Sequence, residues 1–247
     1  MAEFVVQSAN NMPVQAPLVP DPVVPYSGES ITVYALCEVD EATIKKYLAP
    51  TPFTSASNQC LIYVNDFSKS KRLPYMDAGI ILQIKYRDLK GGYYLFEYED
   101  NDAAIETGRS LWGYPKKYAD ITLKREGNRV RGLAMRKGKP IIEVECDLSA
   151  PVPRFEKMQV FPHLNLQTIP KAEGPGIWKQ RVIARDNSMD CRLISEEFGQ
   201  VKVKLSGLPT DPLDAFTPTR IIGGGYTVVD FLAGEVNGWG KVVADLI

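Results

Sequence analysis

Two adjacent lysines, Lys116 and Lys117, are the residues whose types and spacing point most directly to chemistry. They follow Pro115, whose fixed φ and missing N–H give the pair a stiff start just after an expected helix end at Gly113. Neighbouring ammonium groups disfavour each other's charge, and burial in an apolar wall disfavours it further. One lysine of the pair would then be neutral and nucleophilic near pH 7, which is the requirement for Schiff-base catalysis.

The side chains around the lysines are aromatic, and this favours burial. Trp112, Tyr114 and Tyr118 flank the pair, whereas a bare Lys-Lys dipeptide after proline is usually a solvated turn. We expect Trp112 and Tyr114 to shape a dry substrate pocket, with ordinary core packing as an equally good account of Trp112. Arg109, near the end of the preceding helix, has an expected structural role: it would bind carbonyl groups or an acidic neighbour.

The stretch Gly-Arg-x-x-x-x-Tyr-Pro-Lys-Lys, residues 108–117, has an acidic turn and Ala-Ala-Ile before it. This pattern resembles the signature of the acetoacetate decarboxylase family. By this resemblance, Lys116 is the Schiff-base residue and Lys117 is the partner that lowers its pKa. Asp77 matches the acidic residue that faces the lysine in the family and handles protons. A turn aspartate before a strand is the ordinary alternative for Asp77.

Two places depart from the family pattern. In our best register, Glu38 stands where the decarboxylases carry an arginine for the substrate carboxylate, and it would repel an anionic substrate. The strand that supplies a second glutamate to the family's pocket reads Cys60-Leu-Ile-Tyr-Val64 here, with Tyr63 as its candidate pocket residue. Arg220 is a further pocket candidate. The residues expected to form the Schiff base match the family pattern, whereas the residues expected to bind the carboxylate of a keto acid differ from it.

The resemblance implies a lyase in which Lys116 attacks the ketone of a β-keto acid or a related oxo-metabolite. The resulting iminium is an electron sink that stabilises the negative charge left when CO2 departs. An aldolase, dehydratase or cyclase of secondary metabolism would use the same Lys116 iminium, and it needs a general acid/base more than a carboxylate clamp. A non-catalytic small-molecule-binding barrel with inert lysines is the third alternative.

Composition limits the classes of partner. With 29 basic and 30 acidic side chains among 247 residues, the formal net charge is −1, which offers no basic footprint for nucleic acid or an anionic membrane. No apolar run approaches the ~20 residues of a membrane span. We therefore expect a cytoplasmic protein that binds a small molecule, and the resemblance implies a homo-oligomer. The four cysteines form no CxxC motif and His163 is the only histidine, so we expect buried free thiols, no metal site and no cofactor.

Prolines and capping residues divide the chain. Five prolines between positions 13 and 25 predict an extended N-terminal arm over residues 1–28, followed by a single domain over residues 29–247. Two short helices are expected. One runs from the N-cap Asp40 to Leu48, and Asp100 or Asn101 caps the other, which delivers the chain to the lysine pair.

Strand signals fill most of the remaining sequence. They are expected at residues 31–39, 60–67, 78–86, 93–98, 121–125, 129–136, 141–148, 180–184, 190–195, 200–205 and 225–232. Glu97 and Glu99 lie two residues apart on one face of one of these strands. They could be paired acids, but a solvated face is their expected environment. A spacing of roughly 8–12 residues is typical of a barrel or a sandwich. The fold class is mainly β, and the resemblance implies a closed antiparallel β-barrel of the acetoacetate decarboxylase-like type, with a few short helices and the lysine in an apolar cavity.

Overall fold

The computed structural model describes residues 18, 27–71, 73–150, 152–232 and 238–247. Most of the expected N-terminal arm, residues 1–28, lies outside these ranges, so its extended form stays a prediction. The single domain over residues 29–247 also stays a prediction. In the part of the chain that is described, no helix has both the length and the apolar character that crossing a membrane requires.

Most strands belong to one large sheet. Its order is β11-β13-β1-β2-β3-β4-β9-β10-β14, and a tenth strand, β5, pairs with β4. Neighbouring strands are antiparallel, with two exceptions: β4 is parallel to β5 and to β9. In chain order the strands are β1 (Ser27–Glu38), β2 (Thr54–Asp66), β3 (Met76–Tyr86), β4 (Leu89–Glu99), β5 (Lys116–Tyr118), β9 (His163–Pro170), β10 (Ile177–Arg185), β11 (Cys191–Phe198), β13 (Arg220–Leu232) and β14 (Lys241–Asp245).

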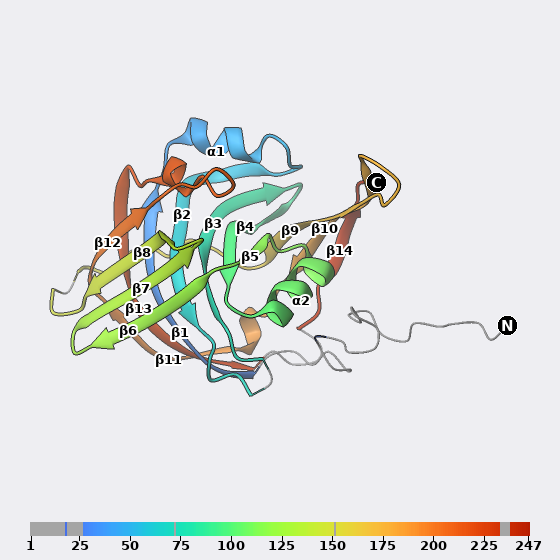
Figure 1. The fold of residues 1–247 in the computed structure, drawn as a ribbon. Coiled ribbons are helices and arrows are strands. Elements are labelled where there is room, and N and C mark those ends of the chain that lie inside the picture. Colours follow the sequence, from blue (N-terminus) through green and yellow to red (C-terminus); the bar gives the residue numbers. More distant parts are fainter. Residues whose placement is uncertain (1–17, 19–26, 72, 151, 233–237) are drawn as a thin grey trace.

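A second, four-stranded sheet with the order β12-β8-β7-β6 packs against one face of the large sheet (Figure 1). Its strands are β6 (Asp120–Glu126), β7 (Arg129–Arg136), β8 (Lys139–Asp147) and β12 (Gln200–Leu205). Gly132 on β7 allows the close approach of the two sheets. A Cβ atom at this position would lie 2.6 Å from Cβ of Val64 and 2.8 Å from Cγ1 of Val33, both on the large sheet.

The central strands of the large sheet have two buried faces. Successive side chains of a strand point to opposite faces. On β1, Val33 and Ala35 belong to the core between the two sheets, whereas Tyr34 and Leu36 line a cavity. The large sheet therefore has one side packed against the small sheet and another side that carries the cavity.

The prediction of a closed barrel is wrong. In the described chain neither sheet closes on itself, because the large sheet ends in two separate edge strands, β11 and β14. An alternating pattern records which face of a strand is buried, but it holds no information on whether the outermost strands pair with each other. The mainly β class is confirmed, and its architecture is two packed sheets.

The two α-helices are short and begin where the sequence predicts. Helix α1 (Glu41–Leu48) starts after Asp40, whose Oδ2 accepts a hydrogen bond from the Thr43 N–H at 2.8 Å. Helix α2 (Asp102–Trp112) starts after Asn101, whose Oδ1 accepts two backbone N–H groups of the first turn. It ends at Gly113, whose φ of 73° lies in the left-handed region. Two 3-10 turns, η1 (Ser188–Asp190) and η2 (Leu213–Phe216), complete the elements.

Candidate active site

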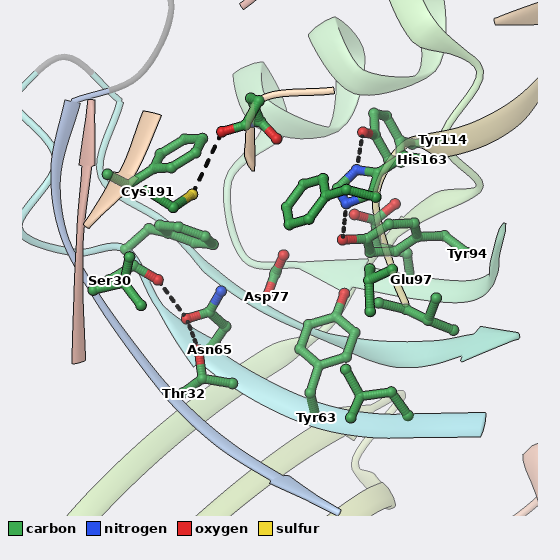
Figure 2. Close-up of a pocket in the computed structure, with 18 of the residues that line it drawn as sticks. Ser30, Thr32, Tyr63, Asn65, Asp77, Tyr94, Glu97, Tyr114, His163 and Cys191 are labelled. Atoms are coloured by element: carbon green, nitrogen blue, oxygen red, sulfur yellow. Dashed lines mark hydrogen bonds between the residues drawn. The ribbon is translucent and has the colours of Figure 1, made fainter. Parts of the chain in front are cut away.

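A cavity of about 850 Å³ lies against the large sheet on the face away from the small sheet. The structure brings five of the predicted site residues together in its wall: Tyr63, Asp77, Trp112, Tyr114 and Lys116. Figure 2 shows Tyr63 and Asp77 with their oxygen atoms turned toward the region of Glu97, beside Tyr114. Strands β2 and β3 and the α2–β5 segment, which are distant in the sequence, therefore build one site.

Lys116 is buried, with only 8% of its surface exposed. Its Nζ forms an ion pair with Glu99 and lies 3.7 Å from Oε1 of Glu97. The same atom lies 5.2 Å from the centroid of the Tyr114 ring. Strand β5 runs parallel to β4 in a register that sets Lys116 opposite Glu97. The pairing of these two strands is what brings the amine to the carboxyl groups.

The end of helix α2 holds Lys116 from another direction. Nη1 of Arg109 donates to the Lys116 carbonyl oxygen at 2.9 Å, in keeping with the structural role expected for this arginine. Gly108 faces the lysine side chain, and a Cβ atom there would lie 2.5 Å from Cδ and 3.0 Å from Nζ of Lys116. Glycine at this position therefore leaves the space in which the amine packs.

The expectation that Glu97 and Glu99 form a solvated face is wrong. Glu97 is 3% exposed and Glu99 is fully buried, because both side chains pack against the Lys116 amine that β5 places beside β4. The sequence holds a signal that fits this result. Both acids interrupt a strand that is otherwise apolar and aromatic, Tyr93-Tyr-Leu-Phe-Glu-Tyr-Glu99, and an acid in such a run is buried only when it has a partner.

Three carboxyl groups gather around the lysine. Asp77, Glu97 and Glu99 each offer an oxygen atom within 4.8 Å of the others. Burial raises the pKa of all three, and the charge of Lys116 opposes the rise; the pKa of Glu97 reaches about 8. Three carboxyls that share one ammonium group favour a state with some of them protonated. The site therefore contains both proton donors and a proton acceptor near neutral pH.

The pKa of Lys116 is raised, and the expectation of a lysine that is neutral near pH 7 is wrong for this arrangement. Burial by itself lowers the pKa, but the carboxyl groups of Glu97 and Glu99 outweigh it. Sequence reasoning considered the neighbouring lysine and placed these two acids on a solvated face. A nucleophilic amine therefore requires the ammonium proton to move to one of the neighbouring carboxylates.

Lys117 lies on the other side of β5 and does not line the cavity. Its Nζ donates to Oδ1 of Asp211 and to the carbonyl oxygen of Thr210, each at 2.8 Å. Asp211 is fully buried and also pairs with Arg136 at 3.0 Å. Consecutive residues of a strand point to opposite faces, so the expected role of Lys117, lowering the pKa of Lys116, is corrected to that of an anchor for β5.

Glu38 and Arg220, both expected in the pocket, lie outside the cavity wall. They are partners in the register of β1 and β13, and Nε of Arg220 donates to Oε2 of Glu38 at 2.8 Å. The residues of β1 that do line the cavity are Ser30, Thr32, Tyr34 and Leu36. Glu38 lies beyond them, at the end of the strand, so it does not place a repelling charge beside Lys116.

Beside Tyr114, the cavity wall contains residues that sequence reasoning did not assign to the site, namely Tyr94, His163 and Arg185. Nδ1 of His163 lies 2.7 Å from the hydroxyl of Tyr114, and Nε2 lies 3.5 Å from the hydroxyl of Tyr94 (Figure 2). Burial, with the positive charges of Arg185 and Lys116, lowers the pKa of His163 to about 3, so the imidazole is neutral. These residues come from β4, β9 and β10, and no sequence motif links them.

Among the described residues, these three carboxyl groups form the cluster that is compact enough to hold a metal ion. The Lys116 ammonium group, paired with two of them, supplies the positive charge that such a cluster needs. All four cysteines are free thiols. Cys37, Cys60 and Cys146 are buried as the sequence predicts, whereas Cys191 is partly exposed.

Fold and site together define a mainly β protein of the acetoacetate decarboxylase-like class, in which a buried lysine faces a large cavity. The chain belongs to the acetoacetate decarboxylase family, whose sequence profile it matches over residues 11–245. It is 25% identical over 181 residues to an acetoacetate decarboxylase of Burkholderia vietnamiensis, a match that covers 70% of this chain and 69% of that protein. It is 41% identical over 58 residues to acetoacetate decarboxylase 3 of Mesorhizobium japonicum, which spans 24% of this chain and only 23% of that relative.

Solved structures share the fold. An acetoacetate decarboxylase structure superposes with a TM-score of 0.84 at 18% identity and covers 98% of both chains. The enduracididine biosynthesis enzyme MppR, complexed with the condensation product of pyruvate and imidazole 4-carboxaldehyde, superposes with a TM-score of 0.76 at 15% identity, covering 99% of this chain and 98% of that one. At these identities the likeness establishes the fold alone.

Proposed function

We propose that this protein is a lyase that forms a Schiff base between Lys116 and the ketone of an oxo acid, and that it decarboxylates the acid through the enamine. The observation that carries the proposal is the buried Lys116 amine at the wall of the cavity, paired with Glu99 and close to Glu97. Membership of the acetoacetate decarboxylase family supports it.

The carboxyl groups supply the proton steps. A carboxylate beside Lys116 takes the ammonium proton, and the raised pKa values of Glu97 and Glu99 make this transfer less costly than it would be to an ordinary carboxylate. The free amine then adds to the substrate carbonyl. A protonated carboxyl group returns a proton to the carbinolamine oxygen, which leaves as water and gives the iminium.

Decarboxylation then follows from the iminium. The bond between the α-carbon and the carboxylate breaks, CO2 leaves, and the electron pair forms the enamine as the iminium nitrogen loses its positive charge. Asp77 lines the cavity, and its Oδ1 has no hydrogen-bond partner among the described residues. We assign Asp77 to proton delivery at the enamine carbon, after which water releases the ketone and regenerates the amine.

The size of the cavity favours a substrate larger than a four-carbon keto acid. A volume of about 850 Å³ lies near the upper end of the range for pockets that bind molecules of drug size, roughly 300–1,000 Å³. Most of the wall away from the lysine is apolar, with side chains such as Leu36, Leu61, Ile81 and Phe155. An oxo acid with an extended apolar part fits this wall.

Aldolase, dehydratase or cyclase chemistry through the same iminium is the second candidate. The cavity has room for two reactants, and the MppR structure, which shares the fold, holds a condensation product of pyruvate with an aldehyde. In this route no CO2 is lost: a carboxylate of the site removes a proton from the α-carbon of the iminium, and the enamine that results attacks a second carbonyl group. Assembly into a homo-oligomer and a cytoplasmic location stay predictions.

Borohydride reduction tests the Schiff base. The protein is reduced in the presence of acetoacetate, 3-oxohexanoate or 3-oxooctanoate, and its intact mass is measured. We expect a single adduct that disappears in Lys116→Ala and persists in Lys202→Ala, a matched change at an exposed lysine of β12. No adduct with any ketone, or an adduct that survives Lys116→Ala, would refute the proposal and leave the non-catalytic binding protein. Release of CO2 from the same acids separates decarboxylation from aldol chemistry.

A further inference from the structure

Arg185, the last residue of β10, reaches the same cavity as Lys116. Its Cζ lies 4.2 Å from the centroid of the Trp112 ring, and its Nε donates to the carbonyl oxygen of Gly238 at 2.9 Å. Stacking on an aromatic face and a hydrogen bond through Nε hold a guanidinium group in one orientation. The guanidinium group also hydrogen-bonds the hydroxyl of Tyr114. A guanidinium group has five N–H donors, so N–H groups remain for a ligand in the cavity.

No carboxylate among the described residues forms an ion pair with Arg185, and its charge acts on Glu97 only at longer range. Elsewhere in the described chain, Arg136 is paired with Asp211, and Arg192 with Asp230. A cation that faces a cavity without a counter-charge is costly, because the cavity wall replaces part of its hydration. An anionic ligand would supply the missing charge, and a guanidinium group suits a planar oxyanion that accepts two hydrogen bonds.

Arg185 and Lys116 lie against the same pair of aromatic rings. The centroids of Trp112 and Tyr114 are 6.4 Å apart; Arg185 stacks on the first ring, and Lys116 lies near the second. Both cations also act on one buried neighbour, since each contributes to the lowered pKa of His163. A molecule that lies along this aromatic pair can meet both cations.

We propose that Arg185 binds a carboxylate that the substrate carries apart from its reacting ketone, and that this group stays on the product. The reason for retention is electrostatic. A guanidinium group stabilises a carboxylate, whereas loss of CO2 turns the carboxylate into a neutral molecule, so binding of the departing group by Arg185 would stabilise the ground state more than the transition state. The substrate class is an oxo acid with a retained carboxylate. The role of the ketone rests on the proposed function, but the binding of the carboxylate does not.

The test compares two probes of nearly equal shape. 4-Oxopentanoate carries a ketone and a carboxylate, and its methyl ester carries the ketone without the charge. Borohydride trapping of each probe is measured as a function of its concentration in the wild-type protein and in Arg185→Gln, Arg185→Lys and Arg192→Gln. Arg192 is an exposed arginine on β11 that lies outside the cavity wall, so it is the matched control.

We expect the apparent affinity for 4-oxopentanoate to fall about tenfold or more in Arg185→Gln, with the ester changed less than about twofold and Arg192→Gln unchanged. Arg185→Lys should recover part of the preference for the acid over the ester. Equal effects on acid and ester, or no effect on either, would overturn the proposal. If Arg185→Lys prefers the acid over the ester no more than Arg185→Gln does, the charge-based explanation is overturned.

A third probe separates this inference from the Schiff-base proposal. Pentanoate has the carboxylate but no ketone, and its binding to the wild-type protein is followed by ligand-observed saturation-transfer NMR. We expect a signal that Arg185→Gln removes and Arg192→Gln retains. If no ketone forms an adduct, the proposed function fails, yet this result still supports the role of Arg185. A pentanoate signal that persists in Arg185→Gln would overturn it.

Discussion

Lys116 and Lys117 are adjacent in the chain, but their ammonium groups bind carboxyl groups on opposite sides of β5. Lys116 pairs with Glu99 at the cavity wall, and Lys117 pairs with Asp211 in a separate network. The two residues therefore have different tasks, one in the candidate site and one in holding the strand that positions it.

Replacing Lys117 with alanine should leave the pH profile of adduct formation unchanged, because its ammonium group contacts Asp211 and Thr210 and does not line the cavity. Stability should fall by about 1–3 kcal/mol, since the buried Asp211 loses a charged partner. Trapping with pentane-2,4-dione across pH and urea unfolding measure the two effects. Lys117→Arg, which keeps the charge, is the control. A profile displaced to higher pH in Lys117→Ala would restore the idea that one lysine lowers the pKa of the other.

Replacing Glu99 or Glu97 with glutamine should lower the pKa of Lys116. Both carboxyl groups raise it in the wild-type protein, so removing either charge makes the free amine available at lower pH. The pH profile of trapping with pentane-2,4-dione should move down by about 1–3 units. Glu145→Gln, at an exposed position of the small sheet, is the matched control. Profiles that coincide with the wild type in both variants would mean that these acids do not set the charge of the lysine.

Gly108→Ala should displace the amine of Lys116. The new Cβ atom would lie 2.5 Å from Cδ of the lysine, and a reacting group misplaced by about 1 Å reduces rates by up to roughly a hundredfold. The rate of borohydride-trapped adduct formation measures the effect. Ser110→Ala, an exposed position of the same helix, controls for the higher helix propensity of alanine. If Gly108→Ala reacts at the wild-type rate, the side chain of Lys116 can avoid the added methyl group without displacing its amine.

Asp211→Asn should destabilise the protein by about 3 kcal/mol at neutral pH, because it removes the charge that two buried or half-buried cations share. Burial raises the pKa of Asp211, but hydrogen bonds from Lys117, Thr210, Arg136 and Tyr98 outweigh burial and hold the pKa below its usual range.

Because the folded-state pKa of Asp211 is depressed, its stabilisation is present above the ordinary pKa of about 3.9 and is lost as the pH falls below that value. Urea unfolding of the wild-type protein between pH 2 and pH 5 should show this loss. The same series in Asp211→Asn should be flatter, and an equally steep series would assign the acid sensitivity to other carboxyl groups.

Features that depend on near neighbours in the chain could be predicted. The N-caps Asp40 and Asn101 and the left-handed Gly113 use hydrogen bonds and backbone freedom within a few residues. The mainly β class follows from alternation along each strand. The aromatic surroundings of Lys116 follow from its own segment, and the family resemblance identified the residue itself.

Features that depend on strand pairing could not be predicted. The apolar and aromatic run around Glu97 and Glu99 fits their burial but does not identify their partner, and only the parallel pairing of β4 with β5 brings them to the amine. Glu38 and Arg220 come together through the register of β1 and β13, which removes both from the expected pocket.

The sequence by itself determined a mainly β chain with a lysine in an aromatic segment, because residue types and short-range periodicity encode strands and burial. The resemblance to the acetoacetate decarboxylase family made that lysine the candidate for iminium chemistry. Only the tertiary structure decided the charge state of Lys116, the anchoring role of Lys117 and the presence of Arg185 in the cavity. The physical reason is that electrostatic energy depends on distances of a few ångströms between groups far apart in the chain, and strand order and register set those distances.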